Sequence, residues 1–362
     1  MNLDFITTGE SHGKCLNTII TNFPSGIKIN IKTINNELAL RQKGYGRGDR
    51  MNIEKDTVEI NSGINKSGFS TGAPICLEIK NKDWENWKDK EEDIITAPRP
   101  GHADLYGLIK YNNNIRNVIE RSSARETAAR VAAGSIFKQY LDNFGVNIYS
   151  FTTGIDKTDK ELLKTSLSSK EISLCRNSNF NTWNKNKEDK YKSLIDNAIN
   201  TKDSLGGSLR VIVEGVKPGI GSYIDYKSKL DANIAFAITS IQSVKGITFG
   251  NPEYPFSKGS QMHDEIYWDK NKYKHYSNNS GGITGGMSTG ENIYFDVFVK
   301  PIPTLMKPLR TVDINTKLEV PAIKERSDVW IVPACGIVCE SMTAFIIAKE
   351  YLKLCSEKFN TK

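Results

Sequence analysis

Long apolar runs, paired cysteines and histidines are all scarce in this 362-residue sequence. Its first residues, MNLDFITTGESHG, contain neither the basic segment nor the apolar stretch of a signal peptide, and no later run approaches the length of a membrane span. The six cysteines form no C-x-x-C pair, and a chain of this length needs no disulfides to hold a core. We therefore expect a cytoplasmic protein in a reducing compartment, without a membrane partner.

The charge balance is basic but only moderately so. Lys and Arg number 49 against 42 Asp and Glu, which gives a formal net charge of +7, and 38% of the residues are hydrophobic. These values are typical of a globular protein with an anionic partner, and they fit nucleic acid, lipid or small phosphates equally well.

Strand and helix patterns alternate without the regular crossover rhythm of a doubly wound parallel sheet, so we expect an α+β fold. After a Pro-Ser-Gly turn, Ile27, Ile29 and Ile31 lie at period two, which predicts a hairpin. Further strands are predicted over 57–64, 73–84, 208–216 and 292–304, and helices over 123–145, 229–244 and 336–355. The Lys-, Asn- and Ser-rich segment 156–204 interrupts this order, and we interpret it as a polar surface excursion.

The segment RQKGYGRGDR, residues 41 to 50, interleaves Arg41, Arg47 and Arg50 with three glycines. Glycine lets backbone approach a ligand closely, and guanidinium groups pair with phosphate or carboxylate oxygens. The segment is therefore either an anion clamp or a solvated surface turn.

The segment ERSSARET, residues 120 to 127, fits a helix start in which Ser123 and Glu126 form a capping box. A helix N-terminus beside Arg121 and Arg125 is also a candidate anion site.

Three other segments are candidates only in combination. SGGITGGMSTG, residues 280 to 290, is either a mobile loop or a backbone against which something flat packs, and ERSD, residues 325 to 328, taken alone indicates a salt bridge. His12 in GESHG and His102 in RPGHAD each lie in a tight loop, although an isolated histidine is more often structural.

Two other classes of function remain open at this point. Glu10, His12, His102 and Asp104 could supply metal ligands, but neither an H-x-H nor an H-E-x-x-H motif presets a metal geometry, and His263 and His275 lie in a polar stretch. A nucleic-acid-binding protein is the alternative outside the enzymes, although its arginines would be expected along a basic helix rather than among glycines.

Taken in order, GESHG, RQKGYGRGDR, RPGHAD, RSSARETAARVA, GGITGGMS, KPIPT and ERSD resemble the chorismate synthase family. The resemblance runs from about residue 6 to the last helix. It implies one compact domain over residues 1–362, a β-α-β sandwich with helices between sheets, assembled as a homotetramer with reduced FMN in each subunit. The implied activity is that of a lyase acting on phosphates. It converts 5-enolpyruvylshikimate 3-phosphate to chorismate and phosphate by a trans-1,4 elimination, the last common step of the shikimate pathway to the aromatic amino acids.

The resemblance also implies a role for individual positions. Substrate-binding positions are Arg41, Arg47, Arg50, Arg99, Arg125 and Arg326. FMN-binding positions are Arg121, Ser122, Ser123, Gln242, Ser243, Gly285, Lys300, Pro301, Ile302, Pro303, Thr304 and Arg326. An external reductant is expected to reduce the flavin, with NADPH possible at the positions of Arg41 and Arg47.

The catalytic positions that the resemblance implies are Ser11, His12, His102 and Asp328. His12 matches the donor of a proton to the leaving phosphate, and His102 matches the group that protonates the reduced flavin near N1. Asp328 matches the carboxylate that keeps flavin N5 unprotonated so that it can take the C6 proton of the substrate. Imidazole suits such roles because its pKa lies near neutrality.

Overall fold

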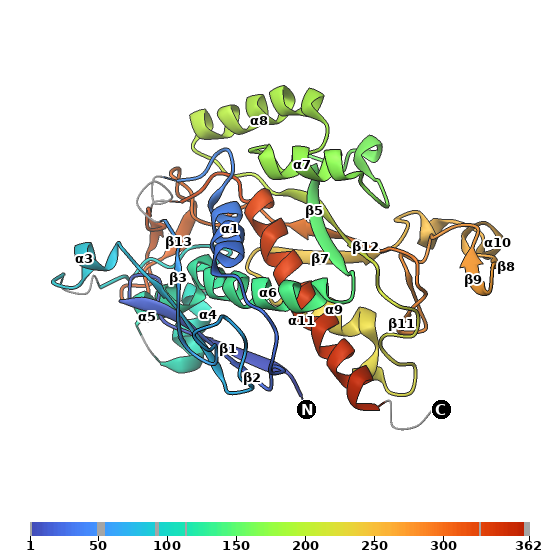
Figure 1. The fold of residues 1–362 in the computed structure, drawn as a ribbon. Coiled ribbons are helices and arrows are strands. Elements are labelled where there is room, and N and C mark those ends of the chain that lie inside the picture. The colour runs from blue at the N-terminus through green and yellow to red at the C-terminus, as the bar shows by residue number, and fades with distance from the viewer. Residues whose placement is uncertain (1, 49–54, 91–93, 113, 326, 358–362) are drawn as a thin grey trace.

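The computed structural model describes residues 2–48, 55–90, 94–112, 114–325 and 327–357. Two four-stranded antiparallel sheets enclose a layer of helices (Figure 1). The first sheet has the order β1-β2-β4-β3, with bounds Asp4–Thr8, Cys15–Thr21, Ile75–Lys80 and Val58–Ser62. The second has the order β5-β6-β12-β7, with bounds Asn147–Gly154, Gly207–Glu214, Ile293–Val299 and Val244–Phe249. The predicted α+β class is confirmed.

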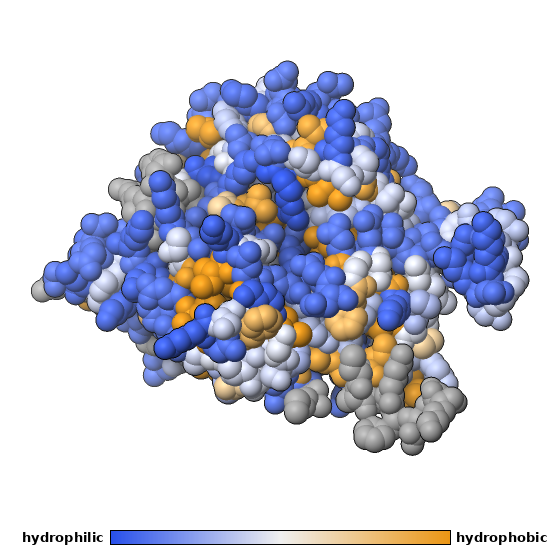
Figure 2. All heavy atoms as spheres, in the orientation of Figure 1, coloured by the Kyte–Doolittle hydropathy of each residue, from blue (hydrophilic) through white to orange (hydrophobic). Residues whose placement is uncertain are grey.

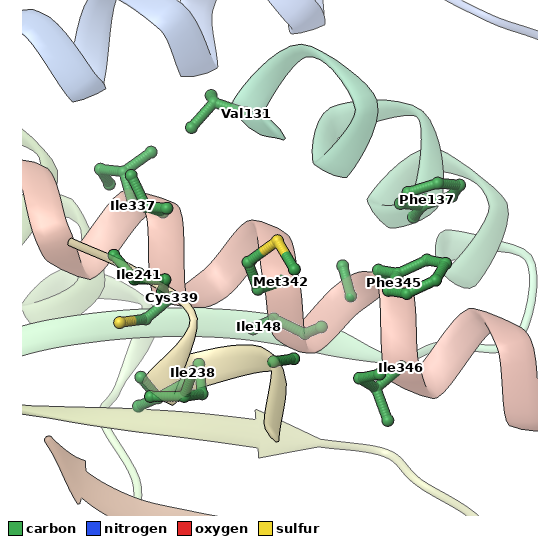
Figure 3. Packing of buried hydrophobic residues seen from close by; sticks show 14 of the residues in the cluster. Val131, Phe137, Ile148, Ile238, Ile241, Ile337, Cys339, Met342, Phe345 and Ile346 are labelled. Carbon is green, nitrogen blue, oxygen red and sulfur yellow. The ribbon is translucent and has the colours of Figure 1, made fainter. Parts of the chain in front are cut away.

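Four helices fill the space between the sheets. They are α1, α6, α9 and α11, with bounds Ile31–Gln42, Thr127–Asp142, Leu230–Thr239 and Val332–Glu357. Helix α6 packs on β1, β2 and β4, whereas α11 packs on β5 and β6, and the two helices contact each other extensively. In Figure 3 Phe345 of α11 lies beside Phe137 of α6, with ring centroids 5.4 Å apart.

Helices α6 and α11 approach each other unusually closely at Gly134. A Cβ atom added at Gly134 would lie 2.2 Å from the Cβ of Ser341 in α11. Only glycine fits there. The small alanine side chains around Gly134 in α6 suit the same close packing of the two helices. The expectation that no run approaches the length of a membrane span is wrong, because residues Val332–Leu354 of helix α11 are long and apolar enough to cross a membrane. However, 94% of the most apolar window of this helix is buried inside the protein, as expected of a core helix.

Shorter elements surround this sandwich. The small hairpins pair β8 with β9, β10 with β11 and β13 with β14, at Ile266–Asp269 with Lys272–His275, Ile283–Thr284 with Met287–Ser288, and Arg310–Val312 with Glu319–Pro321. Among the described residues, the other α-helices are α3, α4, α5, α7, α8 and α10, at Trp84–Trp87, Asp104–Tyr111, Ile115–Ser122, Ser169–Asn177, Glu188–Thr201 and Gly259–Met262.

The segment 156–204 contains α7 and α8, which lie together at one end of the molecule (Figure 1). Their outer surface is mainly hydrophilic (Figure 2). Beneath it, Leu167 and Cys175 pack on Tyr149 and Ile212 of the second sheet, so this segment covers the sheet's outer face.

The predicted hairpin through Ile27, Ile29 and Ile31 is wrong, because helix α1 begins at Ile31. The side chain of Asn30 accepts a hydrogen bond from the Lys32 N–H at 2.9 Å and caps the helix. Ile34 and Leu38 are then buried at helical spacing, so burial along one helix face outweighs the alternation of the preceding residues.

Two other predicted elements also differ in detail. Ser123 caps a short 3₁₀ turn, Ala124–Glu126, by accepting from the Arg125 N–H, and α6 begins only at Thr127. The side chain of Glu126 bonds Thr7 and Arg130, so the reciprocal capping box is not formed. Strand β12 ends at Val299 rather than at residue 304, since prolines at 301 and 303 cannot donate to a ladder.

Candidate active site

His12 lies in the loop between β1 and β2 and is bound by Glu120 of helix α5. One carboxylate oxygen of Glu120 accepts from the His12 backbone N–H at 2.7 Å, and the other lies 2.7 Å from the ring Nδ1. An ionised carboxylate can only accept, so Nδ1 carries the hydrogen and Nε2 is the ring atom that can exchange a proton. The Asp83 carboxylate lies 3.8 Å from Nε2. Burial raises the pKa of Glu120, but hydrogen bonds from His12 outweigh it and leave that pKa below its usual value.

The His12 ring also stacks on Trp87, with centroids 4.1 Å apart and planes inclined by 29°. The guanidinium of Arg116 lies over the same indole at 5.1 Å. Trp87 belongs to α3, directly after the loop that follows β4, so the ring of His12 is fixed by two separate elements.

His102 has a different setting, in the loop before α4. Its Nδ1 bonds Oδ1 of Asp104, which is fully buried. Arg99 also donates to Asp104, through Nε at 2.9 Å and Nη2 at 3.1 Å, and its Nη1 donates to Thr304 at 2.8 Å. Burial raises the pKa of Asp104, but the hydrogen bonds from His102 and Arg99 prevail and hold it well below its usual range.

Arg41 and Arg125 share the buried carboxylate of Asp56. Arg125 donates to both Asp56 oxygens at 2.7 and 2.8 Å, and Arg41 lies 3.7 Å from the same group. Arg41 also donates to Thr127 and to the Ala124 carbonyl, both at 2.9 Å. Burial lowers the pKa of Arg41 to about 10, and Arg125 and Arg47 add to this effect while Asp56 opposes it.

Asn81 connects this arginine pair to the His12 loop. Its side chain accepts from Arg125 Nε at 2.9 Å and donates to the carbonyls of Glu10 and Gly13. Ser123, just before Arg125, donates to Ser11 at 3.1 Å. The predicted positions Ser11, His12, Ser123 and Arg125 therefore form one connected group.

Arg47 contacts the last predicted catalytic position, Asp328. Arg47 Nη1 lies 3.3 Å from Oδ2 of Asp328, and the Gly48 N–H donates to Oδ1 at 2.6 Å. A Cβ added at Gly48 would lie 3.2 Å from the Ser327 carbonyl oxygen, so the glycine allows this close approach. The predicted positions Arg50 and Arg326 lie outside the described residues.

The predicted FMN positions fall into three groups, two of which lie beside the histidine loops, while Gly285 stands apart. Arg121 donates to the Gly9 and Thr7 carbonyls, and Ser122 donates within its own helix. Lys300 donates to the Gly101 carbonyl beside His102, and its N–H donates to the carbonyl of Ser243. The run of Lys300, Pro301, Ile302, Pro303 and Thr304 thus connects the His102 loop to Gln242 and Ser243.

Gly285 is not brought into this network by any contact within the described part of the chain. It lies at φ +61° in the turn between β10 and β11, and a Cβ there would meet nothing within 4 Å. The neighbouring Gly286 carbonyl accepts from the Leu230 N–H at the start of α9, so this turn is tied to a different helix from the other positions.

Glu325 joins the two histidine settings. Its carboxylate lies 3.2 Å from Arg116, the neighbour of Trp87 and Glu120, and 3.6 Å from Arg99, the partner of Asp104. Sequence reasoning assigned no role to Asp56, Asn81 or Glu325. Glu120 and Glu325 did lie in the singled-out segments ERSSARET and ERSD, whereas Asp56 and Asn81 follow no motif that could have indicated them.

The described residues show features that suit a flavin phosphate and ring. The Oε1 atom of Gln242 is buried and accepts no hydrogen bond from any described residue, so it is available to an N–H donor of a ligand. Burial lowers the pKa of Lys300, with a smaller contribution from the nearby Lys245. An anion between these two lysines would relieve their repulsion. No group of three or more His, Cys, Asp or Glu side chains among the described residues is arranged to hold a metal ion.

An α+β sandwich whose loops gather arginines around two carboxylate-bound histidines defines an enzyme that acts on a small, multiply charged anion. The family model described as chorismate synthase matches residues 3–352. The chain belongs to the chorismate synthase family, which confirms the resemblance seen in its motifs.

Individual relatives agree with this assignment. The chain is 47% identical over 359 residues to the chorismate synthase of Alkaliphilus metalliredigens (strain QYMF), covering 96% of this chain and 94% of the relative. It is 45% identical over 370 residues to that of Aquifex aeolicus (strain VF5), covering 97% and 93%. A solved structure titled Crystal Structure of Chorismate Synthase superposes with a TM-score of 0.80 at 36% identity, covering 98% of this chain and 93% of that one.

Proposed function

We propose that this protein is a chorismate synthase that converts 5-enolpyruvylshikimate 3-phosphate to chorismate and inorganic phosphate. The reaction breaks the C–O bond to phosphate and a C–H bond at C6 and forms a conjugated diene without net redox change. The observation that carries the proposal is the pair of histidines, each fixed by its own carboxylate, beside arginines that the fold collects from separate segments. A phosphate-eliminating enzyme needs these two components, proton transfer and anion binding.

The substrate carries a phosphate and two carboxylates, and we assign its binding to Arg41, Arg47, Arg99 and Arg125. Each of these guanidinium groups is mostly buried and lies near the carboxylate of Asp56, Asp104 or Asp328. These carboxylates hold the guanidinium groups in fixed positions, so less side-chain entropy is lost when an anion binds. Arg50 and Arg326 belong to the same proposed set.

We assign to His12 the proton given to the leaving phosphate. Glu120 holds Nδ1, so the proton is transferred from Nε2. Ser11 and Ser123 bond each other next to this loop and orient it.

Reduced FMN, when bound, supplies the electron density that helps the carbon–oxygen bond to break. Arg121, Ser122, Ser123, Gln242, Ser243, Gly285 and the run 300–304 would hold it. His102 is the proposed proton donor on the flavin side, and Asp328 controls the proton balance there through its carboxylate, which Gly48 and Arg47 fix in place.

The other parts of the proposal follow the family. We propose a lyase of aromatic amino acid biosynthesis that acts in the cytoplasm as a homotetramer and depends on an external reductant, with NADPH possible near Arg41 and Arg47. Four large exposed apolar side chains support the expectation of subunit contacts: Tyr223, Ile224 and Tyr226 before α9, and Phe236 within it. Light scattering of the purified protein tests the tetramer.

An anaerobic assay with 5-enolpyruvylshikimate 3-phosphate and chemically reduced FMN tests the reaction. We expect chorismate and phosphate in equal amounts, and none with oxidised FMN. A folded protein that forms neither product would reject the proposal. A titration with duplex DNA at two salt concentrations then tests the nucleic-acid alternative, for which no observation speaks.

The role of Asp328 has its own test. Asp328→Asn keeps the shape of the side chain, so we expect a variant that still binds FMN and substrate, the substrate somewhat more weakly because Arg47 loses its charged partner. The larger loss should fall on kcat, because the missing charge matters chiefly in the transition state. Single-turnover flavin absorbance with chorismate detection measures this. Wild-type turnover would remove Asp328 from the chemistry, and lost FMN binding would assign it to the cofactor pocket.

A further inference from the structure

The segment 156–204, to which the family motifs assign no role, contacts the loop that carries Arg47. Lys43, directly after α1, donates from Nζ to the carbonyls of Arg176 and Asn177 at 2.9 and 2.6 Å. These are the last two residues of α7, where a helix exposes carbonyls and favours a cation. The Lys43 contact therefore connects the end of α7 to the start of the Arg47 loop.

Tyr45 makes the second connection. Its N–H donates to the Asn179 carbonyl at 3.0 Å, and its hydroxyl donates to Asp196 of α8 at 2.6 Å. Its ring packs on Phe180 with centroids 5.5 Å apart. Three different contacts from one side chain and its backbone fix the direction of the loop.

Gly46 brings the loop against α8 and against the segment of Asp328. A Cβ there would lie 2.8 Å from Ile195 of α8, and the Gly46 carbonyl accepts from the Val329 N–H at 2.8 Å. The loop is thus held between α8 on one side and residues 328–330 on the other. Arg47 and Gly48 reach Asp328 from this position.

Helix α7 is itself anchored to the central layer. Arg176 donates to both oxygens of Glu340 in α11 at 2.9 and 2.7 Å, and Lys138 of α6 lies 2.7 Å from the same carboxylate. Glu340 is fully buried. Burial raises its pKa, but Arg176 and Lys138 outweigh this and hold it below its usual value. The contact that supports the loop therefore ends in the helix layer of the sandwich.

We propose that the α7–α8 segment is a buttress that positions Arg47 for the substrate, with Lys43 and Tyr45 as positioning residues that act through Arg47. This inference rests on the proposed function, because it takes Arg47 as a substrate contact. The hydrophilic side chains that this segment exposes to solvent take no part in positioning Arg47. The contacts that matter are those to residues 43–46.

The test is a double-mutant cycle on substrate binding, measured by calorimetry with 5-enolpyruvylshikimate 3-phosphate and, in parallel, as KM in the anaerobic assay. Lys43→Met keeps most of the length of the side chain and removes its donors. We expect it to weaken binding roughly 10-fold, with kcat changed much less, because misplacement of one binding group is felt in binding. In an Arg47→Ala background the same change should have an effect of less than about 2-fold, since the group through which it acts is gone.

Lys187→Met is the matched control. Lys187 lies in the same segment and pairs with Asp159 and Glu161 at 2.5 and 2.9 Å, both within that segment. We expect unchanged substrate binding. Should Lys43→Met fail to fold, Tyr45→Phe replaces it, because that change removes the hydroxyl and its bond to Asp196 but keeps the ring on Phe180.

Equal loss in both backgrounds would overturn the inference, because Lys43 would then act on the site independently of Arg47. Unchanged binding in Lys43→Met and Tyr45→Phe would overturn it as well. A wild-type protein that binds the substrate but forms no chorismate rejects the proposed function alone, since the calorimetric cycle still tests the buttress.

Discussion

His12 and His102 are both held by a carboxylate, but the two carboxylates are shared differently. Glu120 binds His12 twice, through the ring and the backbone, and the guanidinium of Arg116 lies 3.7 Å from it. Asp104 binds His102 with the oxygen that also accepts from Arg99, and it is fully buried. Glu120 therefore serves one histidine, whereas Asp104 holds together a histidine and Arg99, an arginine proposed to bind the substrate.

The two histidines themselves should give the largest effects. His12→Ala and His102→Ala are each expected to lower turnover by roughly 10²- to 10⁴-fold, the usual range for positioned acid–base groups, while the protein stays folded. Anaerobic turnover and circular dichroism measure this. His263→Ala is the control, since His263 contacts Tyr254 on the exposed side of the molecule. Near-normal turnover in both variants would make the two histidines structural.

The carboxylates should differ in their effect on stability. Asp104→Asn leaves the buried guanidinium of Arg99 without its main partner and should lower the free energy of unfolding by about 3 kcal/mol. Glu120→Gln should cost about 1 kcal/mol, because its site is only partly buried. Urea unfolding measures both, with Glu59→Gln as control, because Glu59 pairs with Lys80 on the exposed surface. Equal losses for Asp104→Asn and Glu120→Gln would break the comparison.

Glu120→Gln should have a clear effect on turnover, although its effect on stability is the smaller of the two. Glu120→Gln can present an amide N–H donor to Nδ1 of His12. Nδ1 would then accept, and the neutral ring would carry its hydrogen on Nε2 instead. We expect turnover to fall roughly 10- to 100-fold with a shifted pH profile and unchanged FMN affinity. An unchanged pH profile would limit Glu120 to holding the loop.

Acid should remove the part of the stability that the ionised Asp104 contributes. The folded-state pKa of Asp104 is depressed, so its contribution is fully present above the unfolded value of about 3.9 and is lost progressively as pH falls toward the folded value. Wild type should therefore lose its stability advantage over Asp104→Asn in this acidic window. Unfolding curves between neutral and acid pH measure the difference, and a constant difference throughout would contradict the assignment.

Much of the fold follows from local pattern, but the partners of the histidines do not. The strand at Val58–Ser62 and the helices through Ala128 and Val338 were predicted because their periodicity reflects burial on one side. The start of α1 at Ile31 was missed because the cap of Asn30 competes with an alternation that fits both structures. Glu120 lies 108 residues from His12, and only the packing of α5 against the β1–β2 loop brings them together.

The contact between Gly134 and Ser341 has a consequence for the distance between parts of the active site. Arg125 lies two residues before α6, and Asp328 lies four residues before α11, so a residue proposed to act in the site stands just ahead of each helix. The two helices are in contact at a point where there is no room for a Cβ atom, so nothing larger than glycine fits between them. We expect a methyl group added at position 134 to push the two helices apart. The distance between Arg125 and Asp328 would then change, although neither residue contacts position 134. The size of one residue in the core thus sets a distance in a candidate site that this residue does not contact.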